Sequence, residues 1–176
     1  MALNDSGRRI SGLIATPATT AAERALEDRT GESGQSTAKR AAKILVAKNV
    51  GFVLPTAKQR QNLLVACAKR GMVVYGRAFD ILKLSEAMDL DDLPTVERNL
   101  DKITVYEIKS TRKTLAADFS GYFFGLSGAE MLVAQSMKHH FRFAFVNTVT
   151  EDFIELTLGE VFARAKGIYP TWSIMF

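Results

Sequence analysis

Several residue types that would point to a particular class of protein are scarce in this sequence. A single cysteine, Cys67, excludes an internal disulfide framework and a cysteine-rich zinc site. Neighbouring His139 and His140 have no third histidine to complete a metal centre. No apolar run approaches the roughly 18–20 residues of a membrane-spanning helix, and the polar residues 1–12 lack the apolar centre of a signal peptide. We therefore expect a cytoplasmic protein with no membrane partner.

The composition indicates a globular chain whose basic and acidic residues are concentrated in different regions. Its 176 residues are 47% apolar and 24% charged, which excludes a wholly disordered or collagen-like protein. The net charge of +4 averages three regions. Residues 1–79 hold 13 basic and 5 acidic side chains, residues 80–102 hold 3 and 7, and residues 103–176 hold 7 of each. The basic first half suits contacts with phosphate groups, although a solvated helical surface has the same composition.

The hydrophobic pattern predicts one α/β domain with a mixed sheet over residues 37–176. It follows an N-terminal arm, residues 1–36, that is flexible or weakly helical because it is rich in Ala, Thr, Ser and Gly. Helices are expected over 38–48, 57–70 (between Thr56 and Gly71), 127–138 and 159–165. Strands are expected over 72–75, 78–84, 103–109, 141–147, 153–158 and 172–176, with an acidic connection over 85–102 that includes a helical turn near 93–100.

The strand 103–109 carries an unusual polar pair. Because alternate strand residues share a face, Glu107 and Lys109 lie beside Ile103 and Val105. The same pattern is also typical of an exposed ion pair at a strand end, which contributes under ~1 kcal/mol to stability. A lone acid, Asp80, stands within the apolar run of the preceding strand. If the two strands are neighbours, the two carboxylates repel each other unless a divalent cation such as Mg²⁺ lies between them.

At these residues the sequence resembles the PD-(D/E)xK nuclease superfamily, which has the restriction-endonuclease-like fold. The matching segments are Phe79-Asp80-Ile81, Glu107-Ile108-Lys109-Ser110-Thr111, the helix start Phe124-Gly125-Leu126-Ser127-Gly128-Ala129-Glu130 with Ala134, and the strand Phe141-Arg142-Phe143-Ala144-Phe145-Val146. The resemblance covers about residues 57–150. It implies an αβββαβ core whose mixed central sheet is flanked by helices, with the N-terminal helical arm outside it.

The resemblance implies an Mg²⁺-dependent DNA endonuclease, most readily of restriction type, with Mn²⁺ as a possible substitute. Asp80 and Glu107 would bind the metal, and Lys109 would activate water or stabilise the transition state. The helix 57–70 has no acid, so the Ile108 carbonyl is the candidate third ligand. Duplex cleavage favours a homodimer or larger symmetric assembly, and a companion methyltransferase would not show in this sequence. The alternatives are a junction-resolving, repair or homing nuclease, and a catalytically silent DNA-binding or assembly protein that retains the fold.

Further polar residues are candidates for DNA contact or for support of the site. The candidates for DNA contact are Lys39, Arg40, Lys43, Lys58, Arg60, Arg77, Ser110, Thr111, Arg112 and Lys113. The candidates for a supporting role are Gln59, Gln61, Glu130 and Gln135, and Glu130 is first of all expected to cap its helix. The helices 38–48 and 57–70 could also imitate a helix-turn-helix, although their linker is longer than its usual turn.

Overall fold

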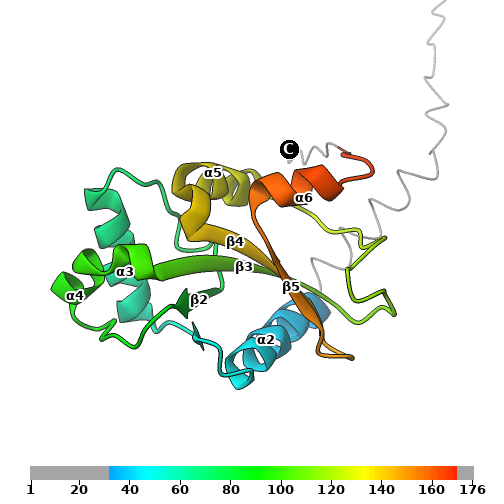
Figure 1. Cartoon of the computed structure of the whole chain (residues 1–176), viewed down its shortest axis with the longest axis horizontal. Coiled ribbons are helices and arrows are strands. Elements are labelled where there is room, and N and C mark those ends of the chain that lie inside the picture. Colours follow the sequence, from blue (N-terminus) through cyan, green and yellow to red (C-terminus); the bar gives the residue numbers. More distant parts are fainter. Residues whose placement is uncertain (1–31, 170–176) are drawn as a thin grey trace, which may run out of the picture.

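The computed structural model describes residues 32–169, with side chains from Ser36 onward. Within these residues the chain is α/β, with a five-stranded mixed sheet flanked by helices (Figure 1). The strands are β1 (Phe52–Val53), β2 (Ile81–Leu84), β3 (Ile103–Thr111), β4 (Phe141–Asn147) and β5 (Phe153–Leu156). They follow one another across the sheet in chain order. Strands β3 and β4 are parallel, and the other neighbours are antiparallel.

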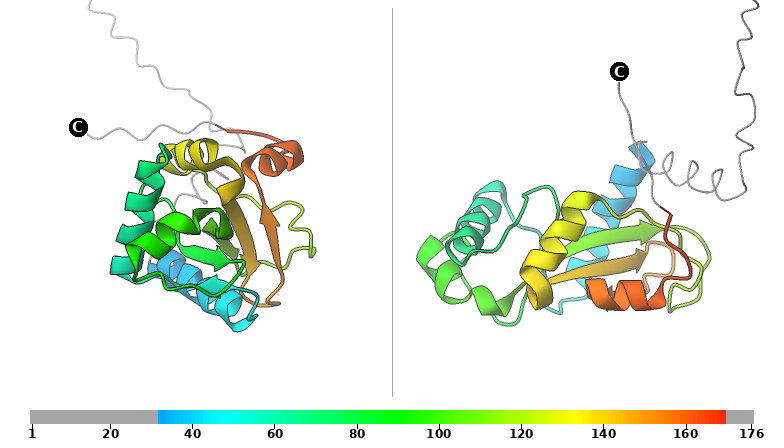
Figure 2. Two further views of the ribbon diagram at one scale, coloured as in Figure 1. Left: turned by 60° about the vertical axis from the view of Figure 1, so that its left-hand side comes forward. Right: turned by 90° about the horizontal axis from the view of Figure 1, so that it is seen from above.

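Helices cover both faces of the sheet (Figure 2). Helix α2 (Glu32–Ala47) lies against one face, and α3 (Ala57–Lys69), α5 (Gly128–Met137) and α6 (Leu158–Arg164) pack against the other. Helix α4 (Leu93–Arg98) and the 3₁₀ turn Leu100–Lys102 fill the connection from β2 to β3. A second 3₁₀ turn, Lys138–His140, leads from α5 into β4.

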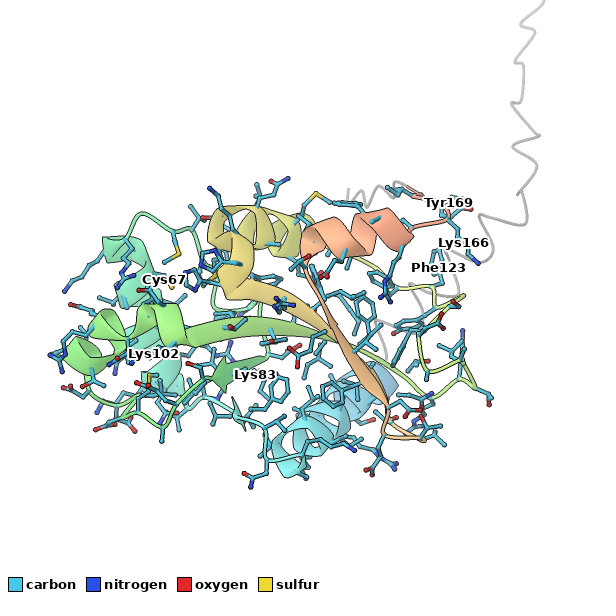
Figure 3. The ribbon with its side chains drawn as sticks, in the orientation of Figure 1. Cys67, Lys83, Lys102, Phe123, Lys166 and Tyr169 are labelled. Carbon is cyan, nitrogen blue, oxygen red and sulfur yellow. The ribbon has the colours of Figure 1, made fainter. Side chains whose placement is uncertain are left out.

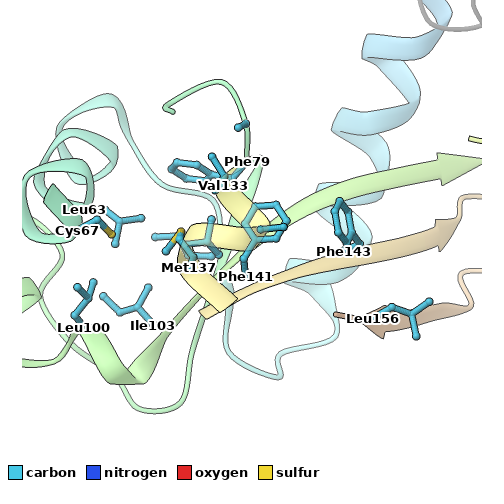
Figure 4. Close-up of a cluster of buried hydrophobic side chains, with 14 of the residues drawn as sticks. Leu63, Cys67, Phe79, Leu100, Ile103, Val133, Met137, Phe141, Phe143 and Leu156 are labelled. Carbon is cyan, nitrogen blue, oxygen red and sulfur yellow. The ribbon is translucent and has the colours of Figure 1, made fainter. Parts of the chain in front are cut away.

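The two faces bury separate hydrophobic clusters. The larger one joins α3, α5 and the β4 phenylalanines, including Leu63, Val133, Met137, Phe141 and Phe143 (Figure 4). The smaller one joins α2 to side chains on the opposite face, among them Leu45, Phe52, Ile81, Tyr106 and Ile108. Because β4 is buried on both faces, it reads as a nearly continuous apolar run.

Cys67 belongs to the larger cluster and packs there as a small core residue. Its thiol is fully buried, and burial raises its pKa to about 11. The inert thiol form therefore prevails at neutral pH.

Local signals set where three of the helices begin. Thr56, Ser127 and Thr157 cap α3, α5 and α6, each in a capping box with the Gln or Glu three residues later. Gly71, with a φ of 71°, follows the end of α3. The expected cap at Thr56, the expected helix start near residue 127 and the capping role of Glu130 are confirmed.

The expected strand over 72–75 is wrong. This segment is irregular, although Val73, Val74 and Tyr75 favour strands, and about half of the Val73 and Tyr75 surface is exposed. Its Val73 N–H donates to the Ser136 hydroxyl on α5 instead of to a strand. The outer antiparallel partner of β2 is Phe52–Val53, a strand of two residues that sequence reasoning missed. Tertiary contacts therefore override β propensity here.

The first described helix begins earlier than expected. Helix α2 starts at Glu32 rather than near residue 38, so residues 32–36 are helical. Helices α2 and α3 lie on opposite faces of the sheet with β1 between them, which rules out the helix-turn-helix imitation. The arm over residues 1–31 and the expected strand 172–176 lie outside the described residues.

We predict that Gly51→Ala strongly destabilises the fold. Gly51 has a φ of +91°, and a Cβ there would lie 2.3 Å from the Leu84 carbonyl oxygen. The strained backbone and the clash together should lower the free energy of unfolding by about 2–4 kcal/mol in urea denaturation. Gly71→Ala is the matched control, because Gly71 also has a positive φ, of +71°, but a Cβ added there would have no atom within 4 Å. It should cost only about 1–2 kcal/mol, and equal losses at the two positions would contradict the clash.

Candidate functional site

The centre of the site is the ammonium group of Lys109, which lies between two carboxylates. Its Nζ donates to Glu107 Oε1 at 2.9 Å and to Glu130 Oε2 at 2.8 Å. The three side chains are 7%, 11% and 11% exposed. Glu107 and Lys109 share one face of β3, as the strand period predicts, and Glu130 comes from the first turn of α5. A buried ion pair of this kind is stable only when its members satisfy one another.

Asp80 joins this cluster from the residue that precedes β2. Its N–H donates to the Tyr106 carbonyl at 2.8 Å, and its Oδ2 accepts the Ile108 N–H at 2.9 Å. The Asp80 carboxylate thus takes the place of a ladder partner for β3. The Glu107 carboxyl lies within hydrogen-bonding reach of Asp80 and also of Glu130. The Asp80 and Glu107 carboxyl groups therefore come together as expected, although Asp80 lies just before β2 and not within the expected strand 78–84.

Arg60 fixes the chain that leads into Asp80. Its guanidinium donates to the carbonyls of Gly76 and Phe79, each at 2.7 Å, and of Asp80 at 3.3 Å. It also lies 4.1 Å from the centre of the Phe79 ring, in a cation–π contact. Sequence reasoning assigned Arg60 to DNA contact and missed this positioning role. The contacts span 16 to 20 residues, so no local pattern indicates them.

Burial and the closeness of several carboxyl groups shift the pKa values in the cluster. Burial, together with the Asp80 and Glu130 charges, raises the pKa of Glu107 to about 8, against the opposing effect of Lys109. Burial also raises the pKa of Asp80, although the Ile108 N–H, Lys109 and Arg60 partly offset it. Glu130 differs: burial would raise its pKa, but Lys109 and the Ser127 N–H hold it below its ordinary value. The raised pKa favours the protonated form of Glu107, and that form can donate a hydrogen bond to a neighbouring carboxylate.

The donor set of the cluster suits a hard divalent cation better than a soft one. Two carboxyl groups with raised pKa values are a natural place for such a cation, because it relieves their mutual repulsion. The N–H and C=O of a strand residue point to the same side, so the Ile108 carbonyl faces the edge that Asp80 occupies. Mg²⁺ binds through one or two carboxylates and retains waters. Among residues 32–169, no group of three or more His, Cys, Asp and Glu side chains is arranged as a complete metal centre.

The candidate DNA contacts do not form one surface. Lys39, Arg40 and Lys43 are exposed on α2, which covers the opposite face of the sheet from the cluster. Lys58 is exposed on α3, 3.9 Å from Asp91. Arg77, three residues before Asp80, is exposed.

The polar residues after Lys109 divide into buried and exposed ones. The Ser110 carbonyl accepts the Tyr122 hydroxyl at 2.6 Å, and the buried Thr111 hydroxyl accepts the Lys113 N–H at 3.1 Å. Arg112 and Lys113 have exposed side chains. The cations that flank the cluster along the chain are therefore Arg77, Arg112 and Lys113.

The four residues proposed to support the site also separate. Gln59 caps α3 and donates to Asp91 at 2.9 Å. Gln61 and Gln135 are exposed. Glu130 alone among these four has a recorded hydrogen bond to Lys109.

A groove of about 940 Å³ opens on the other face of the sheet. Its lining includes Lys83, Tyr106, Arg142 and Glu155. Glu155 accepts from the Tyr106 hydroxyl at 2.5 Å and from Lys83 Nζ at 2.6 Å. Lys83, which is labelled in Figure 3, belongs to β2 and lies on this face. Since Tyr106 points away from Glu107 and Lys109, the groove is separate from the carboxylate–lysine cluster.

Comparisons of the chain with models of protein families, with curated proteins and with solved structures find no match. Among the helices that the structure describes, none combines the length and the apolar character that crossing a bilayer requires.

We predict that Glu107 makes the metal-free protein less stable as the pH rises. With a folded-state pKa of about 8 against an ordinary 4.5, the folded state holds the proton where the unfolded state has lost it. This contribution is fully present below pH 4.5 and is lost as the pH rises through 8. Glu107→Gln, unfolded by urea in a chelator, should therefore show a flatter decline of stability between pH 5 and 9. Parallel curves for the two proteins would contradict the raised pKa.

Proposed function

We propose that the protein is an Mg²⁺-dependent DNA endonuclease of the PD-(D/E)xK type. The observation that carries the proposal is the meeting of Asp80, Glu107 and Lys109 at one point across β2 and β3, with the lysine buried among carboxylates. This is the residue set and the strand relation that the resemblance implies.

The arrangement of elements supports the same proposal. Helix α2, the antiparallel strands β1, β2 and β3, helix α5 and the parallel strand β4 follow an αβββαβ order. Helix α3 is inserted between β1 and β2, so this order begins at α2 and β1, before the residues 57–150 that the resemblance covers. The restriction-endonuclease-like fold is therefore the finer class that we propose for this α/β domain.

Asp80, Glu107 and the Ile108 carbonyl would hold the cation. When bound, it would neutralise the carboxylates and stabilise negative charge on a scissile phosphate. Two of the three N–H groups of Lys109 are engaged by Glu107 and Glu130, which leaves one to donate to an oxygen of the phosphate or of the attacking water. The ammonium thus places positive charge where charge develops in phosphodiester hydrolysis.

The exposed cations that flank the cluster supply a means of binding DNA. Arg77 comes before Asp80, and Arg112 and Lys113 come directly after β3. Arginine and lysine side chains at such positions bind the phosphates of a duplex and make the affinity depend on salt. Cleavage of both strands would then require two copies of the chain, so a homodimer belongs to the proposal.

One observation favours an alternative, a catalytically silent DNA-binding or assembly protein. The Lys109 side chain is only 7% exposed, and its recorded partners are Glu107 and Glu130 of the same chain. A cluster that is closed in this way also serves as internal structure. Restriction, junction-resolving, repair and homing roles share the proposed chemistry, and mapping the ends of cleavage products distinguishes them.

We predict that Lys109→Ala lowers the rate of plasmid cleavage with Mg²⁺ at least about 100-fold, because a preorganised donor is lost at the phosphate. The variant should also be less stable, because Glu107 and Glu130 lose their buried partner. At a temperature where circular dichroism shows both proteins folded, DNA affinity, measured by fluorescence anisotropy, should stay near that of the wild type. Lys83→Ala is the matched control. It removes a strand lysine that is also paired with a glutamate, at 2.6 Å from Glu155, but on the opposite face.

The Lys83 variant should cleave like the wild type. Wild-type protein that binds DNA and cuts no substrate with Mg²⁺ or Mn²⁺ would favour the silent binder. Loss of cleavage in both lysine variants would point to a general loss of structure.

A second prediction concerns the metal alone. Mg²⁺ should raise the midpoint of thermal unfolding of the wild type, since a ligand that binds only the folded state at 100 times its Kd adds about 2.7 kcal/mol. Asp80→Asn should abolish most of this shift, because it removes one of the two charged ligands. An equal shift in the variant, measured by calorimetry without DNA, would exclude Asp80 as a ligand.

A further inference from the structure

One oxygen atom of Glu130 makes two contacts of different kinds. Oε2 accepts the Ser127 N–H at 2.9 Å, which closes the capping box of α5. The same Oε2 accepts Lys109 Nζ at 2.8 Å. The N-terminus of α5 and the polar end of β3 are therefore joined through a single carboxylate.

The other two capping boxes show that capping does not require this burial or this charge. Glu160 closes the box of α6 on the surface, where its Oε2 accepts the Thr157 N–H at 2.7 Å. Gln59 closes the box of α3 with a neutral amide, at 3.0 Å from the Thr56 N–H. The Glu130 side chain is instead buried, at 11% exposed, and faces an ammonium group. Its burial and its charge thus need a reason besides the cap.

We propose that Glu130 is a positioning residue that holds the Lys109 ammonium in place against Glu107. The packing of α5 against the sheet brings the Glu130 carboxylate to the lysine. A lysine has four flexible carbons and three rotatable donors, so one acceptor leaves its ammonium free to turn. Glu107 from β3 and Glu130 from α5 accept two of the N–H groups of Lys109, and this fixes the direction of the third. The segment 112–127 between the two elements allows α5 to bring its carboxylate to the lysine from 21 residues away.

This inference rests on the proposed nuclease function only for its consequence in catalysis. The positioning itself concerns contacts within this chain, and it is measurable without metal or DNA. Glu130→Gln is the informative variant, because glutamine preserves a capping box, as Gln59 does, while it removes the charge that holds Lys109. Glu160→Gln makes the same change in a box that has no lysine partner.

The experiment measures acetylation of Lys109 by an N-hydroxysuccinimide ester in chelator, read by mass spectrometry and normalised to Lys58, whose side chain is 67% exposed. We expect Lys109 to be acetylated several-fold faster in Glu130→Gln than in the wild type, and Glu160→Gln to match the wild type. In cleavage assays Glu130→Gln should lower kcat and leave KM for DNA unchanged.

Three results would overturn or separate the claims. If Lys109 is acetylated in Glu130→Gln at the same rate as in the wild type, the positioning role is overturned, whatever the cleavage data show. Equal acceleration in both glutamine variants also overturns it, because the effect would then come from the cap. Faster acetylation in Glu130→Gln alone, with no cleavage by the wild type, supports the positioning role while the nuclease proposal fails.

Discussion

The arrangement of β2, β3 and α5 depends most on the ion pairs that the buried ammonium group of Lys109 makes. This ammonium group is held by Glu107 from its own strand and by Glu130 from α5, and Asp80 completes the group from the start of β2. Isolated charges at this depth would cost several kcal/mol each. The contacts therefore require β2, β3 and α5 to meet in one register, so the ion cluster and the packing of the sheet support each other.

Strand β3 carries a polar cluster on each of its faces. Glu107 and Lys109 point toward α5, while Tyr106 points the other way and donates to Glu155, which also pairs with Lys83. Helices pack on both sides of the sheet, so the first cluster is buried, whereas the second lines the groove and stays partly exposed. The cluster on the α5 face brings together Asp80, Glu107 and Lys109, and its Asp80 and Glu107 carboxyl groups have raised pKa values. Because these are the residues that the resemblance implies, we place the proposed chemistry there.

Local chemistry made much of this fold predictable. The strand over 141–147 has the expected bounds, since its β-branched and aromatic residues are buried on both faces. Thr56, Ser127 and Gly71 mark helix ends because hydroxyl caps and a left-handed glycine act within a few residues. The segment 72–75 has the same strand-favouring composition, but the strand beside β2 is Phe52–Val53. Which segment pairs with an edge depends on distant contacts.

The amino-acid sequence by itself determined the α/β class, the helix caps and the alternation that puts Glu107 and Lys109 on one face of a strand. Each of these depends on neighbours within a few positions, where the period of the backbone decides the outcome. Only the tertiary structure decided that Glu130 reaches from its cap to Lys109 and that Arg60 turns from solvent to the carbonyls before Asp80. Those contacts join residues about 20 positions apart, and such pairings exist only once strand register and helix docking bring the segments together.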